Sequence, residues 1–236
     1  MQLLVSVSNE AEAYAAREGG ADIIDAKDPH AGALGAVSLD TFRRIQSIVA
    51  SGRPMSAALG DASREDAIER MARRYASAGA TFVKVGFAGI EDVSLVRSLL
   101  RAAVRGAADA HGHVVAVAYA DAMLSTLTLD EVLDAASSGG ASGVLVDTAD
   151  KSGPGLRSLI DGDTLARWIS RAHDAGLTVA VAGKLAIDDL EWARDRGADI
   201  AGVRGAACES GRTSRVVAGK VRLLQTRAAP CCSFAR

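Results

Sequence analysis

The sequence predicts a closed (β/α)8 barrel, and three observations support this fold class. The chain has 236 residues, enough for one barrel of this kind. Eight short apolar runs alternate with Ala-rich amphipathic segments along its whole length. The runs are almost continuously hydrophobic, which is typical of parallel strands covered by helices. In order, the predicted strands are LLVSV (3–7), DIIDAK (22–27), MSAAL (55–59), TFVKVG (81–86), VVAVAYA (114–120), GVLVDT (143–148), TVAVAG (178–183) and IAGVRG (200–205).

The segments between these runs carry helix signals. Residues 63–78 begin with Ser63, a candidate N-cap, and place apolar residues at i, i+3, i+4 and i+7 on one face. The stretch TLDE, at 128–131, has the spacing of a capping box between Thr128 and Glu131. Several predicted helices run into a glycine before the next strand, in EGGAD, SAGAT, SSGGAS, DAGLT and DRGAD. Glycine suits this position because it tolerates the left-handed conformation that ends many helices.

The main alternative fold is an open doubly wound sheet, but no GxGxxG follows the first predicted strand. Four prolines and the absence of a linker-like stretch give no reason to divide the chain. We therefore expect one catalytic domain over residues 1–227. The remaining residues, 228–236 (AAPCCSFAR), are expected to form a disordered C-terminal tail.

Composition narrows the class of partner. A net charge of −2 with 4% aromatic residues argues against a nucleic-acid surface, which needs a basic patch or stacking platforms. No apolar run approaches the roughly 20 residues that a membrane helix requires. The N-terminus MQLLVSVSNE lacks the basic region of a signal peptide. We expect a cytoplasmic protein that binds neither nucleic acid nor membrane, and a homo-oligomer, as is common among barrels.

The cysteines and histidines show no pattern typical of a metal site. Cys208, Cys231 and Cys232 lack zinc-ligand spacing and suit a reduced intracellular protein. His111 and His113 lie in the polar stretch DAHGH, which could bind zinc but is better interpreted as a solvated turn. We therefore expect no metal and no cofactor.

Charged residues at the ends of the predicted strands are the main functional signal, because active sites of this fold lie at the C-terminal ends of its strands. Asp25 and Lys27 end the second strand and, being two residues apart, leave it on the same face. Lys84 lies on the fourth strand, Asp147 ends the sixth, and Lys151 begins the loop that follows. Alternate strands share the inward layers of a barrel, so these residues predict a lysine-rich pocket inside its top.

Two interpretations of this cluster stay open. A buried salt-bridge network, with Asp25 paired to Lys27 or Lys84, could close the barrel mouth. A catalytic pocket is favoured, because buried ion pairs are weak stabilisers and so many would be an expensive structural device. A neutral lysine forms an imine with an aldehyde or ketone. Neighbouring ammonium groups and desolvation lower a lysine pKa, and aspartates can move protons.

The loops after the seventh and eighth strands predict a phosphate site. The stretches VAGKL (181–185) and VRGAACESG (203–211) are short, contain glycine and open onto predicted helices. In barrels these two loops frequently bind phosphate through backbone N–H groups. The candidates are Gly183, Lys184, Gly205, Ala206 and Ala207. Two other stretches, AGALGA (31–36) and KSGPGL (151–156), are either mobile loops over the mouth or simple turns.

Three short motifs, D-x-K at 25–27, V-K-V-G at 83–86 and D-T-A-x-K at 147–151, resemble those of the (5-formylfuran-3-yl)methyl phosphate synthases. The stretches SAALGD, AYAD, AGKL and AGVRGAAC add to this resemblance, which covers residues 1 to about 224. These synthases are the furan-forming enzymes of methanofuran biosynthesis. The resemblance implies a TIM-barrel lyase that condenses two molecules of glyceraldehyde 3-phosphate. The product would be 4-(hydroxymethyl)-2-furancarboxaldehyde phosphate, formed with loss of phosphate and water.

Carried over by motif, the resemblance implies that Asp25, Lys27, Lys84, Asp147 and Lys151 are the catalytic cluster, which the strand ends also select. We expect Lys27 to form the Schiff base, with Lys151 as the alternative, and the aspartates to move protons. The expected partner is a small phosphorylated aldehyde substrate. The resemblance places the enzyme in one-carbon metabolism. Two alternatives remain: another Schiff-base triose- or pentose-phosphate aldolase or isomerase, and a non-catalytic phosphosugar-binding barrel.

Overall fold

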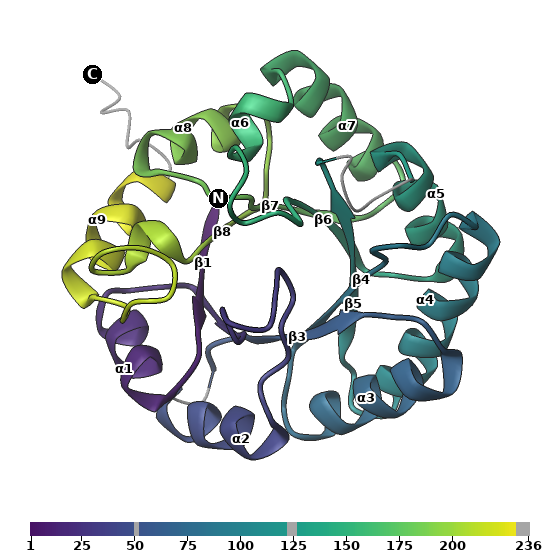
Figure 1. Cartoon of the computed structure of the whole chain (residues 1–236), viewed down its shortest axis with the longest axis horizontal. Coiled ribbons are helices and arrows are strands. Elements are labelled where there is room, and N and C mark those ends of the chain that lie inside the picture. The colour runs from purple at the N-terminus through teal and green to yellow at the C-terminus, as the bar shows by residue number, and fades with distance from the viewer. Residues whose placement is uncertain (50–51, 122–126, 230–236) are drawn as a thin grey trace.

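The structure is a closed eight-stranded barrel surrounded by helices (Figure 1). It is a computed structural model that describes residues 1–49, 52–121 and 127–229. Each strand pairs in parallel with the next in sequence, and β8 pairs with β1. The strands are β1 (Gln2–Val7), β2 (Ile23–Ala26), β3 (Met55–Asp61), β4 (Phe82–Gly86), β5 (His113–Tyr119), β6 (Gly143–Asp147), β7 (Thr178–Val181) and β8 (Ile200–Val203). The predicted fold class is confirmed, and strand ends differ from the predicted runs by no more than two residues.

Helices between consecutive strands form the outer layer. They are α1 (Glu10–Glu18), α2 (Leu39–Ile48), α3 (Glu65–Ser77), α4 (Val93–Ala108), α5 (Leu129–Gly139), α6 (Leu156–Leu159), α7 (Gly162–Asp174), α8 (Ile187–Asp195), the short 3₁₀ helix η1 (Gly205–Ala207) and α9 (Ala218–Ala228). The main hydrophobic core lies between this layer and the barrel, where Phe42 of α2 and Leu99 of α4 pack fully buried. Because α9 extends to Ala228, the ordered domain reaches just past the predicted end at residue 227. Most of the predicted tail, residues 230–236, lies outside the described residues.

The helix-end signals are confirmed with one exception. Thr128 and Glu131 form the predicted capping box at the start of α5. The glycine that precedes the next strand has a positive φ in all five predicted stretches, from +74° at Gly176 to +97° at Gly79. The prediction that Ser63 caps α3 is wrong, because the helix begins two residues later, after Arg64. No side-chain hydrogen bond caps this helix. Its first turn carries acidic residues, whose negative charge interacts favourably with the positive end of the helix dipole.

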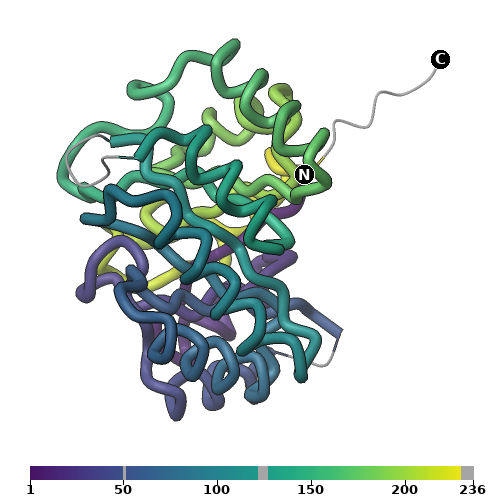
Figure 2. The backbone as a smooth tube through the Cα atoms, turned by 90° about the vertical axis from the view of Figure 1, so that its right-hand side faces the viewer, coloured from purple at the N-terminus to yellow at the C-terminus, as the bar shows by residue number. Residues whose placement is uncertain are grey.

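The two ends of the barrel have different roles. In the side view of Figure 2, the N-terminus and the segment between β2 and α2 lie at opposite ends. That segment, residues 27–38, crosses the barrel opening in Figure 1. Its Ala33 and Leu34 are buried against Val117 and Tyr119 of β5. The AGALGA stretch therefore covers part of the mouth, as one of its two interpretations predicts.

Small side chains leave part of the barrel interior open. Ala180 and Ala182, on and just after β7, and Gly202 of β8 face inward, where bulky branched residues usually fill such a barrel. These residues line one continuous cavity with side chains from the other strands. The barrel can therefore hold charged side chains and a ligand in the space that hydrophobic packing normally occupies.

A buried ion pair joins the first and last β/α units of the barrel. Arg204, directly after β8, donates to both carboxylate oxygens of Glu12 in α1, at 2.9 and 3.2 Å. It also donates to the backbone carbonyl of Ser6 at 3.0 Å. Burial would raise the pKa of Glu12, but the hydrogen bond and charge of Arg204, together with hydrogen bonds from Ser8, hold it below its usual value. Arg204 thus holds the β1–β8 junction together.

Replacing Arg204 with methionine should destabilise the protein by about 3–5 kcal/mol, because Glu12 would stay buried without its partner. The double variant Arg204→Met/Glu12→Leu should recover most of this loss, since no unpaired charge remains. Urea unfolding followed by circular dichroism measures both free energies. An Arg204→Met variant as stable as the wild type would show that the pair is not needed for closure.

Candidate active site

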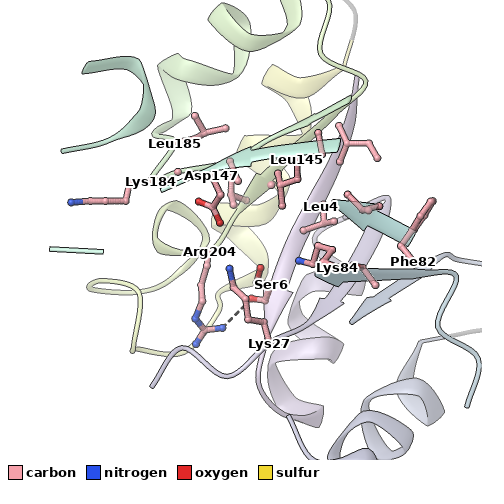
Figure 3. Close-up of a pocket in the computed structure, with 18 of the residues that line it drawn as sticks. Leu4, Ser6, Lys27, Phe82, Lys84, Leu145, Asp147, Lys184, Leu185 and Arg204 are labelled. Atoms are coloured by element: carbon pink, nitrogen blue, oxygen red, sulfur yellow. Dashed lines mark hydrogen bonds between the residues drawn. The ribbon is translucent and has the colours of Figure 1, made fainter. Parts of the chain in front are cut away.

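A cavity of about 750 Å³ lies inside the barrel and extends from the N-terminal ends of the strands, at His113 and Thr178, to the C-terminal ends, at Asp147. Figure 3 shows Ser6 of β1, Lys84 of β4, Asp147 of β6 and Lys27, which directly follows β2, converging on it. This volume is in the range of pockets that bind small molecules. Of the five residues predicted to meet in a pocket, Lys27, Lys84, Asp147 and Lys151 line the cavity, and Asp25 lies behind its wall, in contact with Lys84.

Asp25 and Lys84 form the first of two buried ion pairs. Nζ of Lys84 is 2.7 Å from Oδ2 of Asp25, and the Ser6 hydroxyl donates to the same oxygen at 2.7 Å. The Asp25 side chain is fully buried. Burial alone would raise its pKa, but the ammonium groups of Lys84 and Lys27 and these hydrogen bonds outweigh burial and lower it. Asp25 is therefore a carboxylate at neutral pH.

Asp147 and Lys151 form the second pair. Oδ1 of Asp147 accepts from Nζ of Lys151 at 2.7 Å and from the backbone N–H of Thr148 at 2.7 Å. Lys151 also donates to the carbonyl of Thr148 and to its hydroxyl, the latter at 3.3 Å. Burial tends to raise the pKa of Asp147, but Lys151 and Lys27 outweigh it and the pKa falls below its usual value. The Lys151 ammonium is thus held in place by three acceptors.

Lys27 differs from both of these lysines. Its side-chain nitrogen forms no hydrogen bond or ion pair with any described residue, although the residue is only 8% exposed. Burial lowers the pKa of Lys27 to about 8; Asp147 and Asp25 oppose the shift, and Lys84 and Lys151 add to it. Roughly a tenth of Lys27 is then the neutral amine at pH 7, far more than for an ordinary lysine with a pKa of ~10.4.

Two buried oxygen atoms near Lys27 have unused hydrogen-bonding capacity. Oδ1 of Asp25 and Oγ of Ser56 have no partner among the described residues. The two residues are register neighbours on β2 and β3, and Ser56 lines the cavity. Buried polar atoms nearly always have partners, and exceptions often mark reactive groups. Oδ1 of Asp25 is an acceptor available to take a proton.

The loops after β7 and β8 present backbone N–H groups at the cavity. Gly183, Lys184, Gly205 and Ala206 line it, and none of their amides donates a hydrogen bond to another described residue. Gly183 and Lys184 both have positive φ, +98° and +59°, which is uncommon for a lysine. The Lys184 ammonium is directed outward, where it donates to the carbonyl of Gly153 (Figure 3).

The fifth phosphate candidate, Ala207, is placed differently. It is fully buried and does not line the cavity, and its N–H donates to the carbonyl of Arg204 at 2.9 Å. Ala207 therefore cannot offer its amide to an anion in the cavity, unlike the other four candidates.

Comparison with known families gives the cluster a context. Residues 3–225 match the family described as 4-HFC-P synthase. The chain belongs to this family. It is 37% identical over 219 residues to the (5-formylfuran-3-yl)methyl phosphate synthase of Methanopyrus kandleri, covering 91% of this chain and 92% of the relative. It is 36% identical over 233 residues to the synthase of that name from Methanothermobacter thermautotrophicus, covering 95% and 98%. The resemblance inferred from the motifs is confirmed.

Solved structures share the fold of this 4-HFC-P synthase family member. A 3-hexulose-6-phosphate synthase superposes with a TM-score of 0.69 at 21% identity, over 97% of this chain and 100% of that one. Deoxyribose phosphate aldolase from Aeropyrum pernix superposes with a TM-score of 0.69 at 18% identity, over 95% and 88%. At these identities the likeness establishes the TIM-barrel architecture alone.

Ser6, Ser56 and Arg212 are among the residues that line the cavity of this family member but were not selected from the sequence. A signal was available for the two serines, which interrupt the apolar runs LLVSV and MSAAL at inward-facing positions. No such signal marks Arg212, because it comes from an irregular loop after β8. Asp121, which follows β5, accepts from the amides of Ala149 and Asp150 at 2.7 and 2.6 Å and so holds the loop after β6.

Within the described residues, no three His, Cys, Asp or Glu side chains are grouped to hold a metal ion. His113 lies 3.1 Å from the hydroxyl of Ser142 at the N-terminal end of the barrel. None of the helices in the described part of the chain is both long and apolar enough to cross a membrane.

The lowered pKa of Lys27 can be measured by trace acetylation across a pH series, followed by mass spectrometry of the peptide that contains it. The reactive amine fraction in the folded protein should rise with pH around a midpoint of about 8. In denaturant the same peptide should return toward the ordinary lysine value of ~10.4. Asp147→Asn should lower the midpoint further, because a carboxylate that favours the ammonium form is lost. Equal midpoints in folded and denatured protein would contradict this description of the site.

Proposed function

We propose that this chain is a carbon–oxygen lyase that condenses two molecules of glyceraldehyde 3-phosphate into (5-formylfuran-3-yl)methyl phosphate through a Schiff base on Lys27. The observation that carries the proposal is the Lys27 amine, which is buried, has no partner among the described residues and has a pKa of about 8. The names of relatives that are 36–37% identical over nearly the whole chain supply the product. Family membership and site chemistry thus support one reaction.

The first half of the reaction uses Lys27 and Asp25. The amine adds to C1 of one triose phosphate, and loss of water gives a protonated imine. Asp25, whose Oδ1 accepts no hydrogen bond from a described residue, takes the proton from C2. The protonated imine takes up the electron pair of the broken C–H bond and becomes an enamine. The enamine then expels phosphate from C3, and the imine forms again. The result is an enol whose C3 is nucleophilic.

The second half joins this carbon to the other triose. The product carries its formyl group at ring position 5 and its phosphomethyl group at position 3, so the new bond must end at the central carbon of the second triose. That triose therefore reacts as its ketone tautomer, formed by proton transfer from C2 to C1, a step suited to Asp147. Its free hydroxyl closes the ring on C2 of the first triose, and two waters leave. Hydrolysis of the imine releases the formyl group, so one phosphate and two waters are lost overall without an oxidant.

The other lysines would serve as fixed charges. Lys84 and Lys151, each 2.7 Å from a carboxylate, would stabilise oxyanions as carbonyl oxygens gain charge. Lys151 is less suited than Lys27 to form the imine, because its nitrogen already donates to Asp147 and to both oxygens of Thr148. One triose phosphate would bind the free amides of Gly183, Lys184, Gly205 and Ala206.

A product assay with glyceraldehyde 3-phosphate as sole substrate tests the function. We expect ultraviolet absorbance from a conjugated furan aldehyde and one phosphate released for every two trioses consumed. Lys27→Met should lower turnover on the order of 10³-fold or more, because the nucleophile is lost. Arg43→Met, on the exposed side of α2 and outside the cavity lining, is the control and should keep wild-type turnover. A phosphosugar without the furan would identify an aldolase or isomerase instead, and no consumption of substrate would identify a binding protein.

The predicted phosphate site has its own test in Gly205→Asp. A Cβ at Gly205 would meet no atom closer than 3.8 Å, so the substitution fits, yet its carboxylate would repel phosphate. The substrate concentration at half-maximal rate should rise about tenfold or more, because charge-assisted hydrogen bonds to the phosphate would be lost. Gly219→Asp, which has open space around it in α9, is the control and should leave this concentration unchanged. An unchanged value for Gly205→Asp would remove this loop from the phosphate site.

A further inference from the structure

Two phosphorylated trioses must occupy the barrel together if the proposed function is correct, and the inference that follows rests on that function. The loops after β7 and β8 offer backbone amides for one phosphate. Inside the barrel, Lys84 and Lys151 already have carboxylate partners. The phosphate of the second triose therefore needs another cation at the mouth.

A second pocket opens directly beside the main cavity. It lies between the loops that follow β2, β6 and β8, and its lining includes Pro29, His30, Asp150, Lys151 and Arg212. Lys151 and Arg212 line both pockets, so the two spaces adjoin at these side chains. A molecule in the second pocket could thus extend into the cavity toward Lys151.

Arg212 is the unexplained charge at this junction. Its guanidinium donates to the carbonyls of Pro29 and Gly32 at 2.8 and 3.2 Å. No carboxylate among the described residues lies within ion-pair distance of it. Burial and the nearby Arg204 lower the pKa of Arg212, because both disfavour its positive charge. Two of the five N–H donors of a guanidinium are used in these bonds, and others remain for an anion.

We propose that Arg212, together with His30, binds the phosphate group of the second triose phosphate in the pocket between the loops after β2, β6 and β8. Arginine suits this task because its planar fork binds phosphate through parallel hydrogen bonds. The ring of His30 is exposed and forms no hydrogen bond with a described residue. The carboxylate in the lining, Asp150, already accepts from the amide and hydroxyl of Ser152 at 2.8 and 2.6 Å. With its phosphate here, the second triose would present its carbonyl to Lys151 and Asp147.

The same geometry couples substrate binding to the loop over the mouth. The carbonyls that Arg212 contacts belong to the segment between β2 and α2, which crosses the barrel opening (Figure 1). A phosphate bound to Arg212 would bridge this loop and the loop after β8. The second triose would thus be enclosed by the loop that Arg212 already holds.

Binding stoichiometry of glycerol 3-phosphate, measured by isothermal titration calorimetry, tests the proposal. This probe has the phosphate but no carbonyl, so it cannot form an imine. Wild-type protein should bind two molecules per chain. Arg212→Gln, which loses the charge, should weaken one of the two sites about tenfold or more. Ala206→Asp, at a position that lines the main cavity but not the second pocket, should weaken the other. Arg215→Gln should change neither, since Arg215 is exposed and pairs with Glu209 in the same loop.

A further variant separates a phosphate ligand from a simple loop tether. Arg212→Lys keeps the charge, so it should bind the second molecule more tightly than Arg212→Gln, although both can donate to a loop carbonyl. Equal binding by the two variants, or wild-type stoichiometry in Arg212→Gln, would overturn the proposal. So would a single site in the wild type. If two sites are found and Arg212→Gln loses one, but glyceraldehyde 3-phosphate yields no furan, then the site stands and the proposed function fails.

Discussion

An imbalance of charge inside the barrel governs this site: three lysine side chains share it with two carboxylates. Asp25 pairs with Lys84 and Asp147 with Lys151, so the third lysine, Lys27, has no ion-pair partner among the described residues. Moving an unpaired charge from water into a buried site is strongly unfavourable. A buried lysine without a carboxylate partner therefore loses its proton more easily, which means that its pKa falls. The pKa of Lys27 falls to about 8 for this reason. The pairs that look structural are thus what makes one amine reactive.

Small inward-facing side chains leave room for these charged groups inside the barrel. The strands that carry the charges face strands with small inward residues, among them Ala180 and Gly202, so a hollow replaces the usual packed layers. The main apolar core lies outside the sheet, between strands and helices. Two smaller apolar clusters, one around Leu4 and Ile200 and one around Leu34 and Val117, pack on the inner side. The Glu12–Arg204 pair holds the junction where the first and last strands meet.

Most of the fold and the centre of the site follow from local patterns in the sequence. The apolar runs locate all eight strands, and the period of two along a strand puts Asp25 and Lys27 on one face. Which lysine pairs with which aspartate could not be predicted, because it depends on distances across the barrel. Arg212 was missed because its position comes from an irregular loop. The Ser63 cap failed because a loop conformation, not a residue preference, decides where α3 begins.

The most direct test of this account is borohydride reduction in the presence of glyceraldehyde 3-phosphate, followed by peptide mapping of the modified lysine. The account predicts one stable adduct per chain, at Lys27, because its amine lines the cavity, has no hydrogen-bond partner among the described residues and has a pKa of about 8. An adduct confined to Lys84 or Lys151 would contradict the assignment of the reactive amine. Complete absence of an adduct, with the furan still formed, would rule out the imine mechanism itself.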